Sequence, residues 1–151
     1  MKQIPTSAFW LGWLGVIPFA ALSALTLVDA SQWTTFEQTR AMETLIIYGM
    51  IILSFMGGVQ WGLEMSRPDG NGATGFAASV TPALIAFGAS FVSMFAALLI
   101  LIAGFLILLA YDMARIRAGI GPVWYGALRI QLSTAVVICL AAAAYSKIGV
   151  A

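Results

Sequence analysis

Residues 76–111 read FAASVTPALIAFGASFVSMFAALLILIAGFLILLAY, a run without a single charged side chain. As one helix this run would be about 54 Å long at ~1.5 Å per residue, whereas the hydrocarbon core of a bilayer is only about 30 Å thick. Even a strongly tilted helix cannot accommodate that difference in one crossing. The small and polar residues at 88–93 therefore predict a tight turn between two short helices, over 76–90 and 94–111.

Three further apolar segments extend this pattern along the chain. Residues 8–28 and 44–63 each supply about 20 uncharged residues, the length that a helix needs to span a bilayer, and 130–146 form a last span. Composition agrees, because 62% of the residues are hydrophobic and 9% are charged, against about 45–50% and about 25% in soluble domains. The sequence predicts one domain over 1–151, an all-α polytopic membrane helix bundle with about five transmembrane helices. Whether the third and fourth helices cross fully or form a re-entrant hairpin stays open at this point.

The basic residues between the spans predict the orientation of the chain. With five spans, one side of the membrane carries Lys2, Arg67, Arg115, Arg117 and Arg129, and the other carries Arg40 and Lys147. Because cytoplasmic loops are enriched in Lys and Arg, the first side is expected to be cytoplasmic. A single crossing over 76–111 would leave no such asymmetry. The N-terminus is therefore predicted inside and the C-terminus outside.

Several function classes are excluded or disfavoured by what the chain lacks. It contains no histidine, which excludes His-ligated metal or haem sites and Ser–His or Cys–His catalytic pairs. A net charge of +1 without a basic run gives no footprint for nucleic acid. The single cysteine, Cys139, lies in an apolar stretch, as a small hydrophobic residue does. Residues 70–75, GNGATG, match a dinucleotide-binding pattern but lack its strand–helix context, so we interpret them as a loop and expect no cofactor.

A row of small residues marks the second span. Ser54, Gly58 and Gly62 recur every four residues and so share one helix face, next to Gly57. In lipid, small residues let helix backbones approach closely. We expect this row to pack against another helix within the chain, with contact between two copies as the alternative.

Polar residues at the predicted cytoplasmic ends of the spans form a second candidate site. Gln60 and Glu64 are four residues apart, on a different face from the glycines, and should point into the bundle or toward water. Arg129 could reach Glu64 or Asp112, or Asp112 could pair locally with Arg115. The candidate ligand-binding residues are Gln60, Trp61, Glu64, Asp112 and Arg129. The alternative is that Glu64 is merely the first hydrated residue after its helix and that the arginines only set the orientation.

Four segments together resemble a known family. They are Ile17-Pro18-Phe19, residues 53–62 (LSFMGGVQWG), Thr81-Pro82-Ala83-Leu84, and Trp124-Tyr125 with Leu128-Arg129 and Ser133-Thr134. In order and spacing they are similar to an uncharacterised family of small bacterial inner-membrane proteins, a domain of unknown function with mitochondrial multi-pass relatives. The resemblance covers nearly the whole chain, and the Gly-Gly-x-x-Trp-Gly stretch is its most specific part. It implies a multi-pass protein of the bacterial inner membrane but supplies no activity. The family often has histidine where this chain has Gln60, a departure that weighs against acid–base or metal chemistry there.

These observations lead to two expectations about function. The first is a non-enzymatic accessory or assembly protein that packs against a larger inner-membrane complex or against itself, since packing faces abound and catalytic side chains are scarce. The alternative is a small transporter or a lipid- or quinone-binding protein with its polar site around Gln60 and Glu64. An enzyme is the least favoured, because no nucleophile is paired with a base.

Overall fold

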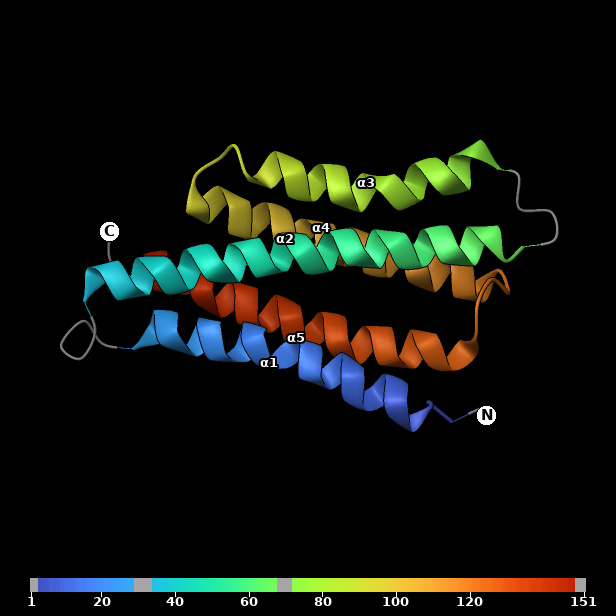
Figure 1. The fold of residues 1–151 in the computed structure, drawn as a ribbon, viewed down its shortest axis with the longest axis horizontal. Helices are drawn as coiled ribbons and strands as arrows, with labels where there is room; N and C mark the ends of the chain where they lie inside the picture. Colours follow the sequence, from blue (N-terminus) through green and yellow to red (C-terminus); the bar gives the residue numbers. More distant parts are fainter. Residues whose placement is uncertain (1–2, 29–33, 68–71, 149–151) are drawn as a thin grey trace.

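The computed structural model describes residues 3–28, 34–67 and 72–148, and within these ranges the chain forms five α-helices and no β-strand. The helices are α1 (Thr6–Leu27), α2 (Thr35–Met65), α3 (Ala73–Ala89), α4 (Met94–Arg117) and α5 (Val123–Ile148). Figure 1 shows them lying side by side along one long axis. The helices α1, α2, α4 and α5 are long and apolar enough to cross a membrane, while α3 is a shorter apolar helix of 17 residues. The predicted polytopic helical fold is confirmed. The division into one domain with five full spans stays a prediction.

The helix α2 is the centre of the bundle. It packs against α1, α3 and α4, while α5 packs against α1 and α4 (Figure 1). Large apolar side chains from four helices fill the space between them: Phe19, Leu53, Leu101, Phe105 and Leu140 are all at most 1% exposed. Burying such side chains together provides close packing, on which helix association in lipid depends.

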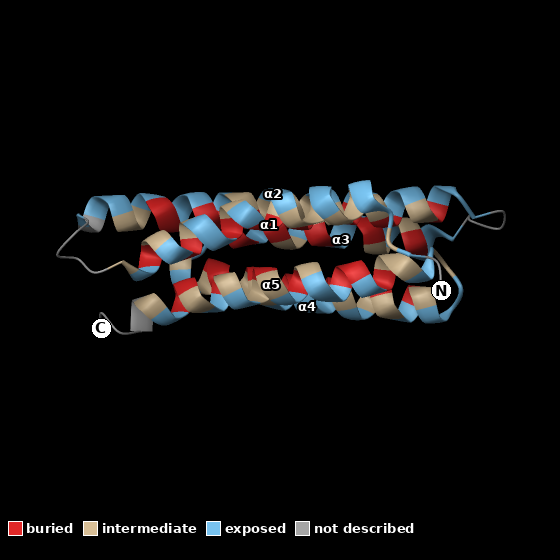
Figure 2. Cartoon of the chain, turned by 90° about the horizontal axis from the view of Figure 1, so that it is seen from below, coloured by how far each residue is buried: buried red, intermediate tan, exposed pale blue. Residues whose placement is uncertain are grey.

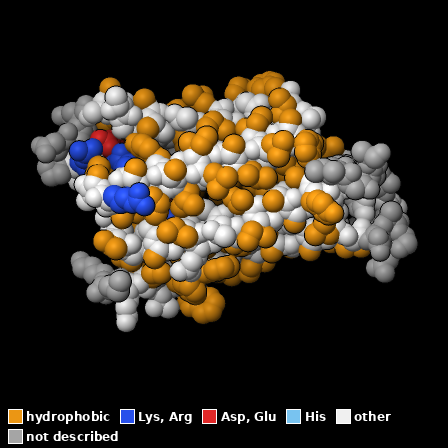
Figure 3. All heavy atoms as spheres, turned by 180° about the vertical axis from the view of Figure 1, so that it is seen from behind, with side chains coloured by type: hydrophobic (Ala, Val, Ile, Leu, Met, Phe, Trp, Pro, Cys, Tyr) orange, Lys and Arg blue, Asp and Glu red, His pale blue; other side chains and the backbone are white. Residues whose placement is uncertain are grey.

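The outer surface of the bundle is apolar as well. Leu11, Phe36, Phe55 and Phe87 are each more than 60% exposed, and Figure 2 places the exposed residues on the outward faces of the helices. In Figure 3, hydrophobic side chains are spread along the whole length of the visible face, and the visible charges gather at one end. An apolar belt of this extent is typical of a surface that meets lipid rather than water.

The α3–α4 connection is the tight hairpin that the uncharged run predicts. Only residues 90–93 separate the two helices. Ser93 is the N-cap of α4, and its side chain accepts a hydrogen bond from the Ala96 backbone N–H. Ser90 donates from its hydroxyl to the Phe87 carbonyl oxygen at 2.6 Å. The two serines therefore satisfy backbone groups that the reversal would otherwise leave unpaired.

The helices extend beyond the apolar segments from which the spans were predicted. The helix α2 begins at Thr35, well before residue 44, because Thr34 and Glu37 form a capping box. The helix α4 continues to Arg117, and α5 begins at Val123. Asp112 and Arg129 therefore lie inside helices rather than in a loop between them. A charged residue ends an apolar stretch of sequence, whereas the helix itself can continue past that charge.

Two members of the small-residue row on α2, Gly58 and Gly62, contact no other helix in the part of the chain that the structure describes. Gly58 and Gly62 are exposed, and a Cβ built on either would meet nothing within 4 Å. Gly57 is the buried glycine, where a Cβ would overlap the Ser79 carbonyl oxygen of α3. Ser54 donates to the Met50 carbonyl oxygen of its own helix at 2.8 Å. The within-chain expectation is therefore wrong for Gly58 and Gly62, since a step of one residue turns a helix face by about 100°. Contact between copies stays a prediction.

Candidate functional site

A buried ion pair joins α4 to α5 at the end of the bundle where α2 and α4 finish. Arg129 Nε lies 2.6 Å from Asp112 Oδ2, and the two side chains are 6% and 0% exposed. The amide nitrogen of Gln60, on α2, donates to the other carboxylate oxygen of Asp112. Both oxygens are bound by donors from two other helices, so the charge of Asp112 is compensated within the bundle. We call Asp112 and Arg129 the inner pair.

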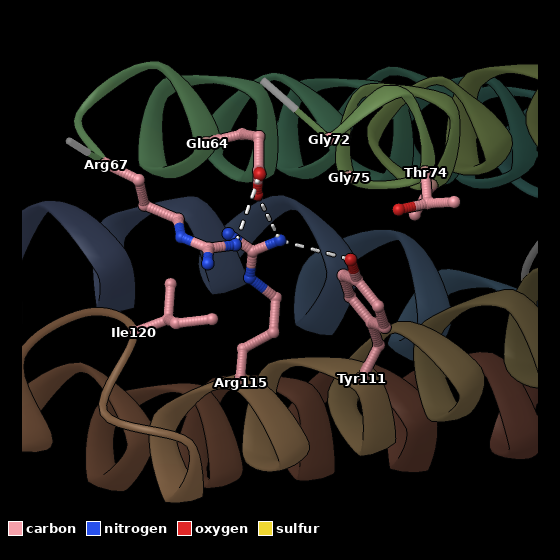
Figure 4. A pocket seen from close by; sticks show the side chains of 9 residues that line it. Glu64, Arg67, Gly72, Thr74, Gly75, Tyr111, Arg115 and Ile120 are labelled. Atoms are coloured by element: carbon pink, nitrogen blue, oxygen red, sulfur yellow. Dashed lines mark hydrogen bonds and ion pairs between the residues drawn. The ribbon is translucent and has the colours of Figure 1, made fainter. Parts of the chain in front are cut away.

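A second ion pair joins α2 to α4 nearby. Arg115 Nη1 lies 2.8 Å from Glu64 Oε2, and Arg67 Nη1 lies 3.2 Å from Glu64 Oε1. The Arg115 guanidinium also donates to the Tyr111 hydroxyl at 3.1 Å and lies over the Tyr111 ring. Figure 4 shows Arg67 and Arg115 converging on the Glu64 carboxylate. We call Glu64 and Arg115 the outer pair, and the part of the bundle that holds both pairs the ionic end.

Helix geometry explains part of this arrangement. Gln60 and Glu64 are one turn apart and are both 1% exposed, so the same face of α2 meets both pairs. Arg115 lies in the last turn of α4, where the helix dipole favours a cation. Glu64 lies near the end of α2, where the dipole disfavours an anion. Two guanidinium groups offset that penalty, because they bring positive charge to both oxygens of Glu64.

Gly75 makes room for the Glu64 carboxylate. It lies in the first turn of α3, and a Cβ built on it would be 2.7 Å from Glu64 Oε1. Real Cβ atoms do not approach so closely, so a larger residue would displace the acid. The sequence predicts a loop over residues 70–75. In the structure, Ala73 to Gly75 are helical. Residues 70 and 71 lie outside the described residues. The glycine pattern is therefore neither a dinucleotide motif nor only a loop.

A pocket of about 410 Å³ opens beside the outer pair, between α2, α3 and α4. Glu64, Arg67, Gly75, Tyr111 and Arg115 line it (Figure 4). Two nitrogen atoms of the buried Arg115, Nε and Nη2, have no hydrogen-bond partner among the described residues. Buried donors in proteins are normally satisfied. An acceptor in this pocket could satisfy those of Arg115.

The inner pair also leaves polar atoms unpaired. Arg129 Nη2, the Ser133 hydroxyl and the Gln60 side-chain oxygen are buried without a hydrogen-bond partner in the part of the chain that the structure describes. The hydroxyl of Tyr125, near the start of α5, is also buried without a hydrogen-bond partner among the described residues. The ionic end thus contains more donors and acceptors than its own contacts use.

The structure brings together four of the five residues proposed for the polar site. Gln60, Asp112 and Arg129 form the inner cluster, and Glu64 lies in the outer pair. Trp61 does not belong to it, because it is 44% exposed and packs on Phe76 with ring centroids 4.7 Å apart. Trp61 directly follows Gln60, and a step of one residue turns its side chain by about 100° around the helix, away from the interior. The local Asp112–Arg115 ion pair is not formed, since Arg115 turns to Glu64 instead.

Sequence reasoning missed Tyr111, Gly75 and the second partner of Glu64, Arg67. Arg67 has a local signal, since it follows Glu64 by three residues, a spacing that places side chains on one helix face. Tyr111 and Arg115 are four residues apart and carry the same signal. Gly75 has no local signal in the sequence, because the room that it leaves for Glu64 depends on how α3 packs against α2.

The arrangement favours binding over covalent chemistry. Three arginines face two carboxylates, so the ionic end carries excess positive charge. Each carboxylate is already engaged by guanidinium and is poorly placed to act as a general base. Within the described ranges, no three acidic, cysteine or histidine side chains gather as a metal site would need. An acceptor-rich, anionic group suits the free donors of Arg115 best.

Comparison with known proteins agrees with a membrane protein. Residues 4–145 match a family described as "Protein of unknown function (DUF3429)". The chain is also 33% identical over 149 residues to Transmembrane protein 69 of Xenopus tropicalis. That alignment covers 93% of this chain and 54% of the relative, so the chain spans about half the length of the curated protein it matches. No solved structure matches it. The family resemblance seen in the sequence is confirmed, and the chain belongs to the DUF3429 family of multi-pass membrane proteins of unknown function.

Proposed function

We propose that this protein binds the anionic head of a phospholipid in the pocket beside the outer pair. The observation that carries the proposal is Arg115, a buried arginine that lines a pocket of about 410 Å³ and has two nitrogen atoms without a hydrogen-bond partner among the described residues. Arginine binds phosphate through several parallel hydrogen bonds, and basic pockets between transmembrane helices accept anionic headgroups. The pocket lies at one end of the apolar belt, where lipid headgroups would lie if the belt spans the hydrocarbon core.

This proposal follows the lipid-binding alternative of the sequence analysis. It makes the protein a ligand-binding membrane protein or a small transporter without enzymatic activity. Arg67, 40% exposed at the pocket, provides the first contact for a phosphate arriving from the surface, and Arg115 provides the deeper one. Glu64 holds both guanidinium groups in place when the pocket is empty.

The test compares two arginines of the same helix. In nanodiscs of phosphatidylcholine, adding phosphatidylglycerol should raise the thermal unfolding midpoint of the wild-type protein, since a ligand that binds the folded state stabilises it. Arg115→Gln should lose that response, whereas Arg117→Gln should keep it, because Arg117 is exposed and does not line the pocket. Equal responses in the two variants would contradict the proposal. A wild-type response to inorganic phosphate as large as that to phosphatidylglycerol would point to a soluble anion instead.

A second candidate is the accessory role, in which α2 packs against a helix of a larger inner-membrane complex. Gly58 and Gly62 favour it, because they leave an open, smooth face on α2 beside the exposed Phe55. Gly58→Leu should then reduce recovery of the partner complex after mild-detergent extraction, while Gly88→Leu, also in open space but on α3, should not. Unchanged recovery with Gly58→Leu would count against this role.

For location we propose the bacterial inner membrane with the ionic end in the cytoplasm. The arginines at positions 67, 115, 117 and 129 lie at that end, where α1 also begins, and α5 ends at the opposite end (Figure 1). Lys2 lies outside the described residues. A reporter enzyme that is active only in the periplasm should work when fused to the C-terminus and fail when fused to the N-terminus. The reverse result would invert the orientation.

A further inference from the structure

A second cavity lies beside Arg129 of the inner pair and, unlike the first pocket, reaches α1 and α5. It has a volume of about 160 Å³ and is bounded by α1, α2, α4 and α5. Along α1 its lining runs from Leu11 to Phe19, and along α5 from Arg129 to Val136. Each stretch covers about two helical turns, or roughly 12 Å. The cavity is therefore a slot that follows the helices, and we call it the α1–α5 slot.

The polar atoms of the slot are confined to one end. Apolar side chains such as Val16, Phe105 and Val136 line most of its length, whereas Arg129 and Ser133 lie toward the ionic end. Ser133 is 1% exposed and its hydroxyl has no hydrogen-bond partner among the described residues; the same holds for Nη2 of Arg129, a residue 5% exposed. Because buried donors are normally hydrogen-bonded, these two groups indicate a site for an acceptor.

The charge around these donors determines which acceptor fits. Arg129 is already neutralised by Asp112 at 2.6 Å, and Gln60 donates to the same carboxylate. An anion at this end would add a second negative charge beside Asp112 without a free cation to balance it. A neutral carbonyl oxygen accepts hydrogen bonds without that cost.

The slot also has an orientation and an entrance. Its polar end is toward the ionic end of the bundle and its apolar part extends inward, as the head and tail of a lipid do in one leaflet. Leu11 and Phe55 on its edge are 69% and 66% exposed, so the slot borders the lipid-facing surface. A ligand can thus enter sideways from the bilayer.

We infer that the α1–α5 slot binds a neutral membrane-soluble molecule that carries a carbonyl group on an apolar chain, with the carbonyl oxygen accepting from Arg129 Nη2 and the Ser133 hydroxyl. Isoprenoid quinones and acyl-ester lipids share this chemistry. The inference is independent of the phospholipid site proposed above, since the two pockets have no lining residue in common.

Gly15 provides a way to close the slot. A Cβ built there meets only the Tyr48 hydroxyl oxygen among the described residues, at 3.9 Å, so a side chain can start from this position without a close contact. Gly15→Leu should fill the slot and reduce affinity for a decyl-substituted benzoquinone by more than tenfold. Quenching of tryptophan fluorescence in detergent solution measures the binding. Gly88→Leu, at the far end of α3 and equally free of neighbours, is the matched control and should bind as the wild type does.

Ser133→Ala tests the polar end separately and is small enough to preserve the fold. Losing one neutral hydrogen bond should weaken binding about fivefold. Decanoate, which has a similar chain but an anionic head, should bind more weakly than the quinone. Displacement of the quinone by dioctanoylglycerol would identify acyl esters as occupants, and failure to displace it would identify quinones. Wild-type quinone affinity in both Gly15→Leu and Ser133→Ala would overturn the inference, whatever Arg115→Gln does to the phospholipid response.

Discussion

The inner and outer pairs lie at the same end of the bundle and differ in one respect. Asp112 and Glu64 are each 1% exposed and each faces an arginine. Asp112 is enclosed by donors from α2 and α5, whereas Glu64 faces a pocket and shares its charge with the 40% exposed Arg67. Two buried carboxylates in one protein can thus hold different roles. The inner pair joins α4 to α5, whereas in the proposed function the outer pair holds guanidinium groups in position for a ligand.

The strongest test of this difference removes the cation of the inner pair. Arg129→Ala would leave Asp112 charged and buried, with Gln60 as its remaining hydrogen-bond donor among the described residues. Breaking one side of a buried pair costs about 3–5 kcal/mol, and we expect that loss in the free energy of unfolding, measured in detergent by circular dichroism. The double variant Arg129→Leu with Asp112→Leu should recover most of it, since no lone charge remains. If the single variant were as stable as the wild type, the inner pair would not fasten the helices.

A smaller loss of stability is expected from a substitution at the contact between α3 and the outer pair. Gly75→Ala would press a methyl group against the Glu64 carboxylate and push it from Arg115. Overpacking of this kind costs about 1–3 kcal/mol, measurable by the same unfolding experiment. Gly62→Ala is the control, because its Cβ would meet nothing and should gain about 0.5–1 kcal/mol of helix propensity. Equal stabilisation in both variants would show that Glu64 does not depend on the glycine.

The smallest effect on stability should come from Arg67→Ala. Arg67 pairs with Glu64 at the pocket edge and is 40% exposed, and such pairs contribute about 0–1 kcal/mol. The variant should therefore unfold almost as the wild type does while losing part of the phosphatidylglycerol response. A loss of stability comparable with that of Arg129→Ala would remove the distinction between the two pairs.

Local spacing predicted much of the fold and some of the site. The uncharged run at 76–111 specified the α3–α4 hairpin because its length exceeds one crossing. The spacing of Gln60 and Glu64 placed both on one inward face. Which arginine each carboxylate would meet was not predictable, since Asp112 and Arg129 belong to separate helices whose rotation about their axes depends on packing.

The glycines of α2 show the limit of such reasoning most clearly. A period of four residues correctly grouped Gly58 and Gly62 on one face but did not say which way that face pointed. Gly57, one position earlier, contacts α3 instead, because its backbone lies close to the Ser79 carbonyl oxygen. The residues that share one helix face can be recognised from the sequence. What that face contacts depends on how the other helices pack around it.

The short length of α3 has a consequence for the surrounding bilayer. With 17 residues it is about 25 Å long at ~1.5 Å per residue, while the 24 residues of α4 beside it reach about 36 Å. The uncharged part of α4, over 94–111, is only about 27 Å long, so the apolar stretches of both hairpin partners are slightly shorter than a hydrocarbon core of ~30 Å. If both helices cross fully, the bilayer beside the hairpin must thin locally, and each ångström of mismatch costs a fraction of a kcal/mol. The hairpin would then fit a short-chain or thinned membrane better than a thick one.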